Sequence, residues 1–169
     1  TTLSLSRCYF QGVQERVVIC SQHGFGDAPS KAYAAVIYLR VTITKGSLVK
    51  FVAPIPELPL AKELSTPRLE LLAALVLARL IEHVKEALQK ELANTDITCW
   101  TYSKVTLFWI TGEEREWKQF VQHRVNEIRS LVTSSSWRHC KGKDNPADIP
   151  SRGLNRVELS KCALWMVGF

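Results

Sequence analysis

The order of apolar segments along the chain is the feature that most restricts its fold. Three predicted strands come first and are joined by turns. A short one ends near Asp27, the second is the segment Tyr33–Thr42, which is rich in β-branched and aromatic residues, and the third, Ser47–Ala53, follows a turn at Lys45-Gly46. A long helix is predicted from Pro67 to about Lys90, with Thr66 as its N-cap. A chain that begins in this way forms antiparallel strands joined as hairpins, and the long helix then packs across the sheet.

The second half alternates between strands and helices. It predicts strands over Ile97–Tyr102 and Ser136–Cys140, helices over Ser103–Ile110 and Lys118–Val132, and a last short helix opened by Asn145-Pro146. Strands joined by tight turns run antiparallel, whereas strands joined through helices run parallel. We therefore predict an α/β fold with a mixed five-stranded sheet in the order 3-2-1-4-5 and helices on both faces. Three prolines between the third strand and the long helix predict a stiff loop, at Pro54, Pro56 and Pro59.

Composition bounds the class of protein. The 169 residues are 46% hydrophobic, which suits one domain with its own core. The longest apolar stretch, Leu71–Ile81, contains Arg79 and is too short to span a membrane. Five cysteines without a C-x-x-C pair predict neither a disulfide framework nor a zinc site, so we expect a reducing, intracellular and cytoplasmic location. Because Met166 is the one methionine, we expect the chain to be a piece of a longer product.

Three acidic residues stand where elements of the predicted sheet begin or end. Asp27 ends the first strand, Glu70 lies near the start of the long helix at the head of an apolar stripe, and Asp148 follows the Asn145 cap. Each has a local explanation, as a turn aspartate, a helix-dipole acid or an acid behind a cap. Together they would meet at one edge of the sheet, where such a cluster repels itself unless divalent cations bind. Oxygen ligands without nearby cysteines favour Mg²⁺ or Mn²⁺ over zinc.

The positive charge is concentrated in one stretch. The formal net charge is +6, and six of the Lys and Arg residues lie between positions 118 and 143, against one acid, Glu127. His123, Trp137 and His139 are interleaved with them. Such a stretch is either a solvated helix face followed by a loop or a surface for nucleic-acid phosphates. The basic residues are Lys118, Arg124, Arg129, Arg138, Lys141 and Lys143.

Five collinear segments resemble the ribonuclease H (RNase H) domain of BEL/Pao-type retrotransposon polyproteins: HGFGDAPSKAYAAVIYLR, STPRLELLAALVLARL, CWTYSKVTLFWI, FVQHRVNEI and WRHCKGKDNPADIPSRG. The match runs from about Cys8 to Gly153. It implies an RNase H-like domain over residues 1–155, and a tail over 156–169 that is the truncated start of the next segment. The implied partners are an RNA–DNA hybrid and the reverse transcriptase and integrase portions of the same polyprotein.

The resemblance also implies a reaction. That family hydrolyses the RNA strand of the hybrid with two Mg²⁺ (or Mn²⁺) ions held by four carboxylates. Asp27, Glu70 and Asp148 match three of these acids, and His139 matches a histidine of the flanking loop. The chain has no Asp-Thr-Gly or Asp-Ser-Gly of an aspartic peptidase and no G-x-G-x-x-G of a dinucleotide-binding fold.

The fourth acid is missing. Where the family has Trp-Thr-Asp-Ser, this chain has Trp100-Thr101-Tyr102-Ser103, and a phenol is neutral at pH 7. Asp96 lies roughly 20 Å back along the strand, and Asp144 is on the loop before Asp148, so no substitute is evident. We expect weakened metal binding and impaired hydrolysis, while the basic residues, with Trp137 or Tyr102 stacking on bases, still bind hybrid. The alternative is a nucleic-acid-binding or structural relic without turnover.

Overall fold

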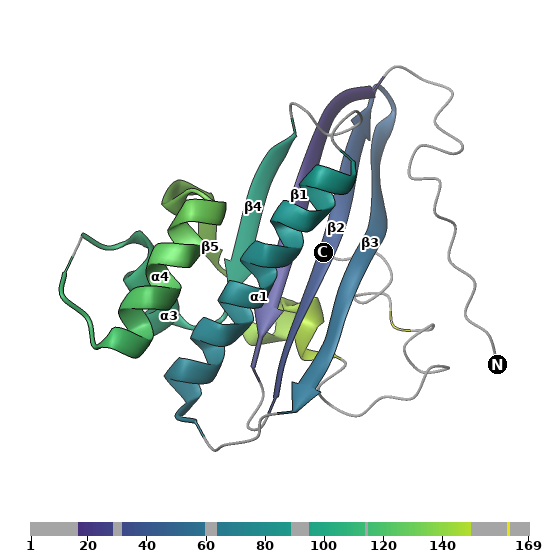
Figure 1. The fold of residues 1–169 in the computed structure, drawn as a ribbon. Helices are drawn as coiled ribbons and strands as arrows, with labels where there is room; N and C mark the ends of the chain where they lie inside the picture. Colours follow the sequence, from purple (N-terminus) through teal and green to yellow (C-terminus); the bar gives the residue numbers. More distant parts are fainter. Residues whose placement is uncertain are drawn as a thin grey trace.

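The computed structural model describes residues 17–28, 32–59, 64–88, 95–113, 115–149 and 162. Five strands form one sheet in the order β3-β2-β1-β4-β5 (Figure 1), as predicted. The hairpin partners β1/β2 and β2/β3 are antiparallel, whereas β1/β4 and β4/β5 are parallel. The strands are β1 (Val17–Asp27), β2 (Ala32–Ile43), β3 (Gly46–Pro59), β4 (Asp96–Thr101) and β5 (Trp137–His139).

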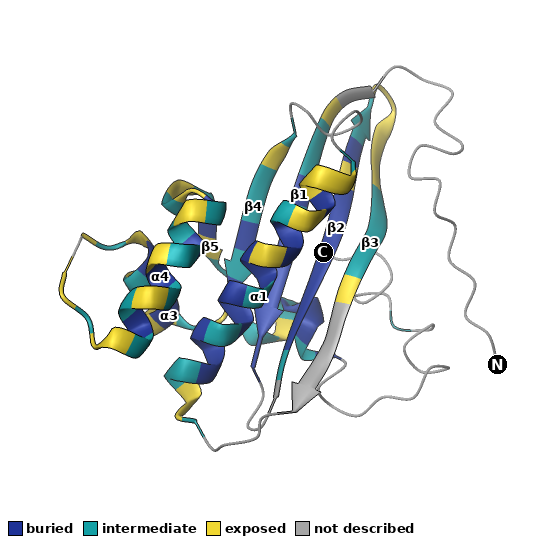
Figure 2. Cartoon of the chain, viewed as in Figure 1, coloured by how far each residue is buried: buried dark blue, intermediate teal, exposed yellow. Residues whose placement is uncertain are grey.

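Three α-helices pack on one face of this sheet. They are α1 (Thr66–Ala87), α3 (Lys104–Thr111) and α4 (Gln119–Leu131), and their buried side chains join those of the sheet in the larger core cluster. Figure 2 shows the buried stripe of α1 turned toward the strands and its exposed residues turned outward. Where α1 passes α4, Arg79 Nη2 lies 2.6 Å from Glu127 Oε1, an exposed ion pair worth at most about 1 kcal/mol.

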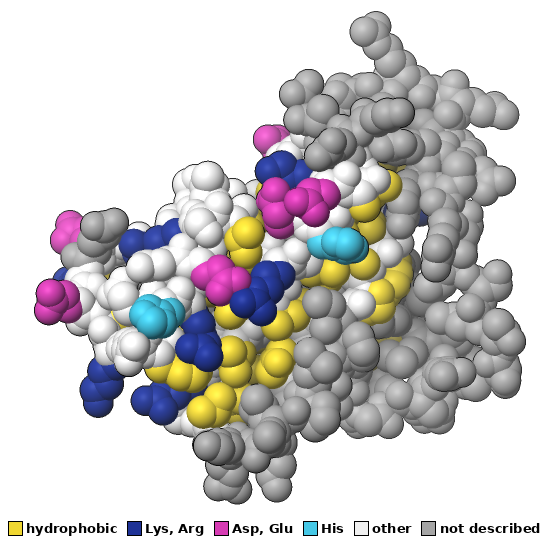
Figure 3. All heavy atoms as spheres, in the orientation of Figure 1, with side chains coloured by type: hydrophobic (Ala, Val, Ile, Leu, Met, Phe, Trp, Pro, Cys, Tyr) yellow, Lys and Arg dark blue, Asp and Glu magenta, His cyan; other side chains and the backbone are white. Residues whose placement is uncertain are grey.

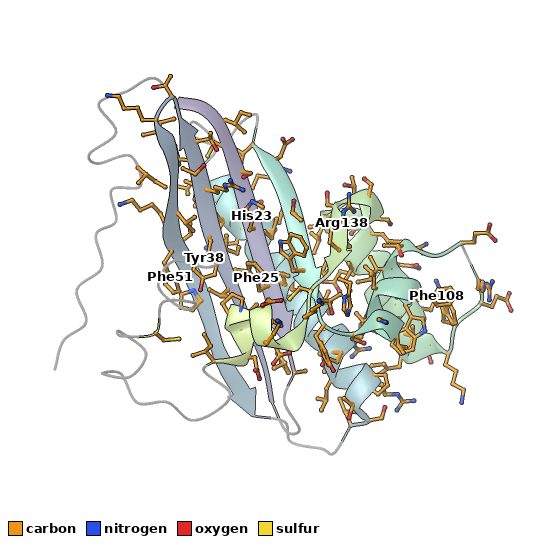
Figure 4. The ribbon with its side chains drawn as sticks, turned by 180° about the vertical axis from the view of Figure 1, so that it is seen from behind. His23, Phe25, Tyr38, Phe51, Phe108 and Arg138 are labelled. Carbon is orange, nitrogen blue, oxygen red and sulfur yellow. The ribbon has the colours of Figure 1, made fainter. Side chains whose placement is uncertain are left out.

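Short 3₁₀ turns complete the described part of the chain: η1 (Ser134–Ser136), η2 (Gly142–Asp144) and η3 (Pro146–Asp148). The last of them packs on the face opposite α1, where Phe25, Tyr38 and Ala147 belong to a second core cluster. Figure 4 shows His23, Phe25, Tyr38 and Phe51 side by side on this face. The predicted helices on both faces are thus α-helices on one side and a 3₁₀ helix on the other.

The start of α1 differs from the prediction by one residue. Ser65, not Thr66, is the N-cap, and its carbonyl accepts bonds from Arg68 N at 2.9 Å and Leu69 N at 3.1 Å. Pro67 fits the first turn because its missing N–H would have had no helical partner. The helix dipole acts most strongly on the first turn. Glu70 is the fifth residue of the helix and lies beyond that turn. The predicted end of the helix at Lys90 lies outside the described residues.

The prediction of a stiff loop at the prolines was wrong. β3 continues to Pro59, and the backbone of Pro54 pairs with Val36. β3 is an edge strand, and every second N–H of an edge strand points away from the sheet. Proline at such a position removes no bond from the ladder, so the segment pairs despite its prolines.

Two further expectations concern the whole chain. The boundary between residues 155 and 156 lies outside the described residues, and of the tail only Cys162 is described. Within the described residues, no helix has the length and apolar character needed to cross a membrane.

Candidate active site

The site forms at the carboxyl ends of β1 and β4. Gly26 of β1 is in register with Thr101 of β4, and the two strands run parallel. Asp27, the last residue of β1, and Tyr102, which follows β4, therefore leave the sheet side by side. In open α/β sheets, ligands bind beyond the carboxyl ends of parallel strands.

Two glycines let α1 lie close to β1. A Cβ atom on Gly26 would lie 3.2 Å from the carbonyl oxygen of Ala73, and one on Gly24 would lie 2.6 Å from Leu77 Cδ1. The close approach fixes the helix against the strand near Ala73. Glu70, three residues earlier on α1, is then held near the end of β1.

Glu70 and Asp27 are both buried, with 6% and 7% of their surfaces exposed. Burial, and next the negative charge of Asp27, raise the pKa of Glu70 to about 8. The Oε2 atom of Glu70 has no hydrogen-bond partner among the described residues. At neutral pH, Glu70 therefore keeps its proton in the cation-free protein, beside an Asp27 carboxylate.

Asn145 joins this strand end to the turn that carries Asp148. Its Nδ2 donates to the Gly26 carbonyl at 3.1 Å and to Asp27 Oδ1 at 3.4 Å. Its Oδ1 accepts from Ala147 N at 3.1 Å, which caps η3 as predicted. The sequence identified Asn145 only as a cap, since its long-range bonds depend on the tertiary fold.

Asp148 is the third residue of η3 and is half-buried. Among the residues that the structure describes, no group of three or more His, Cys, Asp or Glu side chains is arranged to hold a metal ion. The structure thus brings Asp27 and Glu70 within electrostatic reach of each other, and it places Asp148 on the turn that Asn145 ties to β1.

Tyr102 lies at the rim of the site. Its side chain is 53% exposed, and its ring carbons lie 3.6 Å from the position that a Cβ of Gly142 would occupy. The rings of Tyr102 and His139 have centroids 6.3 Å apart and are tilted by 34°. His139 belongs to β5, so its ring is carried by a strand.

Trp137 cannot stack on a base, contrary to the prediction. Only 2% of it is exposed, and it packs in the larger core cluster. Successive residues of β5 point to opposite faces of the sheet, so Arg138 beside it is exposed. In a strand of three residues, either the middle side chain or the two outer ones face the core. The sequence Trp-Arg-His alone did not decide between these two orientations.

The two arginines predicted on the basic helix have structural roles. Arg129 donates to the carbonyls of Trp109, Ile110 and Gly112, at distances from 2.8 to 3.2 Å, and so caps the end of α3. Arg124 lies over the Phe120 ring, with Cζ 3.6 Å from its centroid, and donates to the Phe120 carbonyl. Neither guanidinium is fully available to a phosphate.

The remaining predicted cations are exposed on the surface. Figure 3 shows Lys and Arg side chains gathered around α4 and the lower half of α1. Arg138 donates to the carbonyls of Ser135 and Trp137 through Nη1. The four exposed cations of the predicted set are Lys118, Arg138, Lys141 and Lys143.

A cleft of about 600 Å³ lies away from the carboxylates, between the segment before α4 and α4 itself. It was not predicted, because it depends on how the α3–α4 connection folds back. Arg129, which caps α3, forms part of its wall. The lining residues are Arg115, Glu116, Trp117, Gln122, Asn126 and Arg129.

A family model described as the Pao retrotransposon-like RNase H-like domain matches residues 1–103. The chain belongs to this family. The matched part of this Pao RNase H-like domain contains Asp27, Glu70 and Tyr102, whereas His139 and Asp148 follow it. The resemblance found in the sequence and the predicted sheet order are thus confirmed.

Solved structures similar to the Pao RNase H-like domain include three of RNase H1. LC11-RNase H1, isolated from compost by a metagenomic approach, is 16% identical, with 78% of this chain and 91% of that chain covered and a TM-score of 0.49. The structure of the same protein in complex with an RNA/DNA hybrid is 14% identical and has a TM-score of 0.43, with 77% of this chain and 91% of that chain covered. RNase H1 from the halophilic archaeon Halobacterium salinarum NRC-1 is 14% identical and has a TM-score of 0.42, with 86% of this chain and 100% of that chain covered. No curated protein matches the chain.

Proposed function

We propose that this domain binds RNA–DNA hybrid at the carboxyl ends of β1 and β4, and that its hydrolysis of the RNA strand is impaired. The observation that carries the proposal is the position of Tyr102. It directly follows Thr101, which is in register with Gly26, and its segment Trp100-Thr101-Tyr102-Ser103 resembles the Trp-Thr-Asp-Ser motif of the family. We also propose that the domain acts within a polyprotein, beside reverse transcriptase and integrase portions.

The residues at this site fit one divalent cation and do not fit two. Mg²⁺ is commonly held by one or two carboxylates, with water and substrate phosphates completing its shell. Asp27 and Glu70 would supply those carboxylates, and the buried Glu70 Oε2 without a described partner suits a missing ligand there. A second ion would need further acids, whereas Tyr102 is a neutral phenol and no third group joins the pair in the described residues. A bound Mg²⁺ would supply Lewis-acid polarisation of a phosphoryl oxygen.

The protein's own groups prepare this site without completing it. The Asn145 amide holds the Asp27 carboxylate in place, and Glu70 carries a proton on its side chain until a cation or high pH removes it. No hydrolytic step follows from these groups alone, because two-metal hydrolysis needs enough negative charge to hold both ions.

Binding of nucleic acid rests on other side chains. Lys141 and Lys143 flank Gly142 beside Tyr102, and both are exposed. Contacts between cations and phosphates release counterions, so the logarithm of affinity falls with the logarithm of salt concentration by about 0.9 per contact on a duplex. This predicts strongly salt-dependent binding of hybrid by a site that hydrolyses it poorly.

The test compares binding and cleavage of one hybrid by the wild-type chain and Tyr102→Asp, with Mg²⁺ or Mn²⁺ present. We expect the wild type to bind hybrid and cleave little, and the variant to bind Mn²⁺ and to cleave. Tyr102→Phe is the control, because it changes the phenol without adding a carboxylate. A wild-type chain that cleaves as fast as Tyr102→Asp would refute the impairment.

The binding half of the proposal has its own control. The salt slope is the slope of the logarithm of affinity against the logarithm of salt concentration. Replacing Lys141 and Lys143 together by alanine should reduce its magnitude by about 2, whereas Lys45→Ala, at the other end of the sheet, should leave it unchanged. A wild-type chain that does not bind hybrid even at low salt would instead favour a structural relic.

A further inference from the structure

Tyr102 places an aromatic ring in solvent at the rim of the candidate site. More than half of the side chain, 53%, is exposed, although it directly follows a strand whose Cys99 and Thr101 are buried. The ring therefore contributes little to the core. An exposed aromatic ring beside lysines is the arrangement with which proteins bind single-stranded nucleic acid.

The ring has neighbours on the side of β5 and η2. Two of its carbons lie 3.6 Å from the position that a Cβ atom on Gly142 would occupy, and the centroid of the His139 ring is 6.3 Å from its own. The backbone there is itself anchored, because Cys140 N donates to the Thr101 carbonyl at 3.0 Å. Neighbours that restrict a ring before a base arrives reduce the conformational entropy that is lost on stacking.

The charges around the ring suit a phosphate backbone. Lys141 and Lys143 are exposed on either side of Gly142, against which the ring packs, and Arg138 is exposed on β5. Asp144 is the acid of the η2 turn and is less exposed than the lysines. The exposed charges on the β5 and η2 side of the ring are therefore mainly positive, whereas Asp27 lies on its β1 side.

We propose that Tyr102, backed by Gly142 and His139, is a stacking platform for an unpaired base next to the hybrid. This rests on the proposed binding of nucleic acid, and it assigns that surface a substrate class, a hybrid with a single-stranded overhang. Bases inside a duplex already have neighbours on both faces, so only a terminal or unpaired base offers a free face. Tyr102 is the more exposed of the two rings, so it is the stacking ring and His139 is its support.

The experiment measures the affinity of the full chain for three ligands: a blunt hybrid, the same hybrid with a three-nucleotide overhang, and that overhang made abasic. We expect the overhang to bind about 5- to 150-fold more tightly than its abasic counterpart, the range of one base stacked on an aromatic ring. The ratio of overhang to abasic-overhang affinity should fall to about one in Tyr102→Ala and should persist in Tyr102→Phe. Quenching of 2-aminopurine placed in the overhang reports stacking directly.

Phe108→Ala is the matched control, because Phe108 is also an exposed aromatic residue, 48% exposed on α3. It should keep the ratio of the wild type. A ratio that survives Tyr102→Ala, or that is lost in Tyr102→Phe, would overturn the platform while the binding of hybrid stands. A chain that binds neither blunt hybrid nor single strand would overturn the platform and the proposed function together.

Discussion

Replacing Glu70 by glutamine should change how the stability of the domain depends on pH. Glutamine keeps the shape of the side chain and cannot ionise. In the wild type the folded-state pKa is about 8, against an ordinary value of 4.5. Because the folded state holds this proton more tightly than the unfolded chain does, stability falls as pH rises from about 4.5 to about 8 and is level above that. A difference of about 3.5 pKa units corresponds to a loss of about 4–5 kcal/mol over this range.

The assay is urea unfolding of both proteins from pH 5 to pH 9, in EDTA because a divalent cation would favour the ionised acid. The difference in unfolding free energy between the two proteins isolates the contribution of Glu70 from that of every other titrating group. We expect the unfolding free energy of Glu70→Gln, relative to that of the wild type, to rise by several kcal/mol between pH 5 and pH 8.5. Glu86→Gln, at an exposed position of the same helix, should run parallel to the wild type. Parallel curves for Glu70→Gln as well would refute the buried, protonated acid.

Four other substitutions test the packing of the fold. Gly26→Ala should cost about 1–3 kcal/mol in chemical unfolding, because its Cβ would meet helix backbone at 3.2 Å, whereas Gly24→Ala meets the movable end of a leucine and should cost less; equal costs would contradict this. Arg129→Ala should lower stability by about 1–3 kcal/mol by leaving carbonyls of α3 without donors, and it should leave the salt slope of hybrid binding unchanged; a reduced slope would restore Arg129 as a phosphate contact. Trp137→Ala should lower the melting temperature sharply, at a cost of about 3–5 kcal/mol, and a variant as stable as the wild type would mean that the ring is not in the core.

The sheet order could be derived from the sequence because connection length decides strand direction. The turn at Lys45-Gly46 is too short for anything but a hairpin, and Gly46 has φ 153°, which residues with side chains rarely adopt. The segments between the first, fourth and fifth strands are long enough for crossovers, which make those strands parallel. The extent of β3 could not be derived, since the cost of a proline depends on whether its strand lies at an edge.

The candidate site was predictable where one residue conflicted with its own surroundings. Glu70 is an acid at the head of an apolar stripe, which predicts that it is buried, and it is. Asn145 donates to Gly26 and Asp27, which lie more than one hundred positions earlier, and no local pattern encodes such partners. The arginines of the basic stretch were assigned by charge alone, whereas Arg129 is used by the fold for three backbone carbonyls.

The bond between Asn145 and the end of β1 also sets an order in time. The donor lies 119 positions after the Gly26 carbonyl that it reaches. At about 5–20 residues per second, a ribosome needs about 6–24 s to make the chain between them. Throughout that interval Gly26 and Asp27 have been synthesised but lack this amide. The acidic end of β1 is thus among the first parts of the domain to leave the ribosome and among the last to reach its final hydrogen bonding.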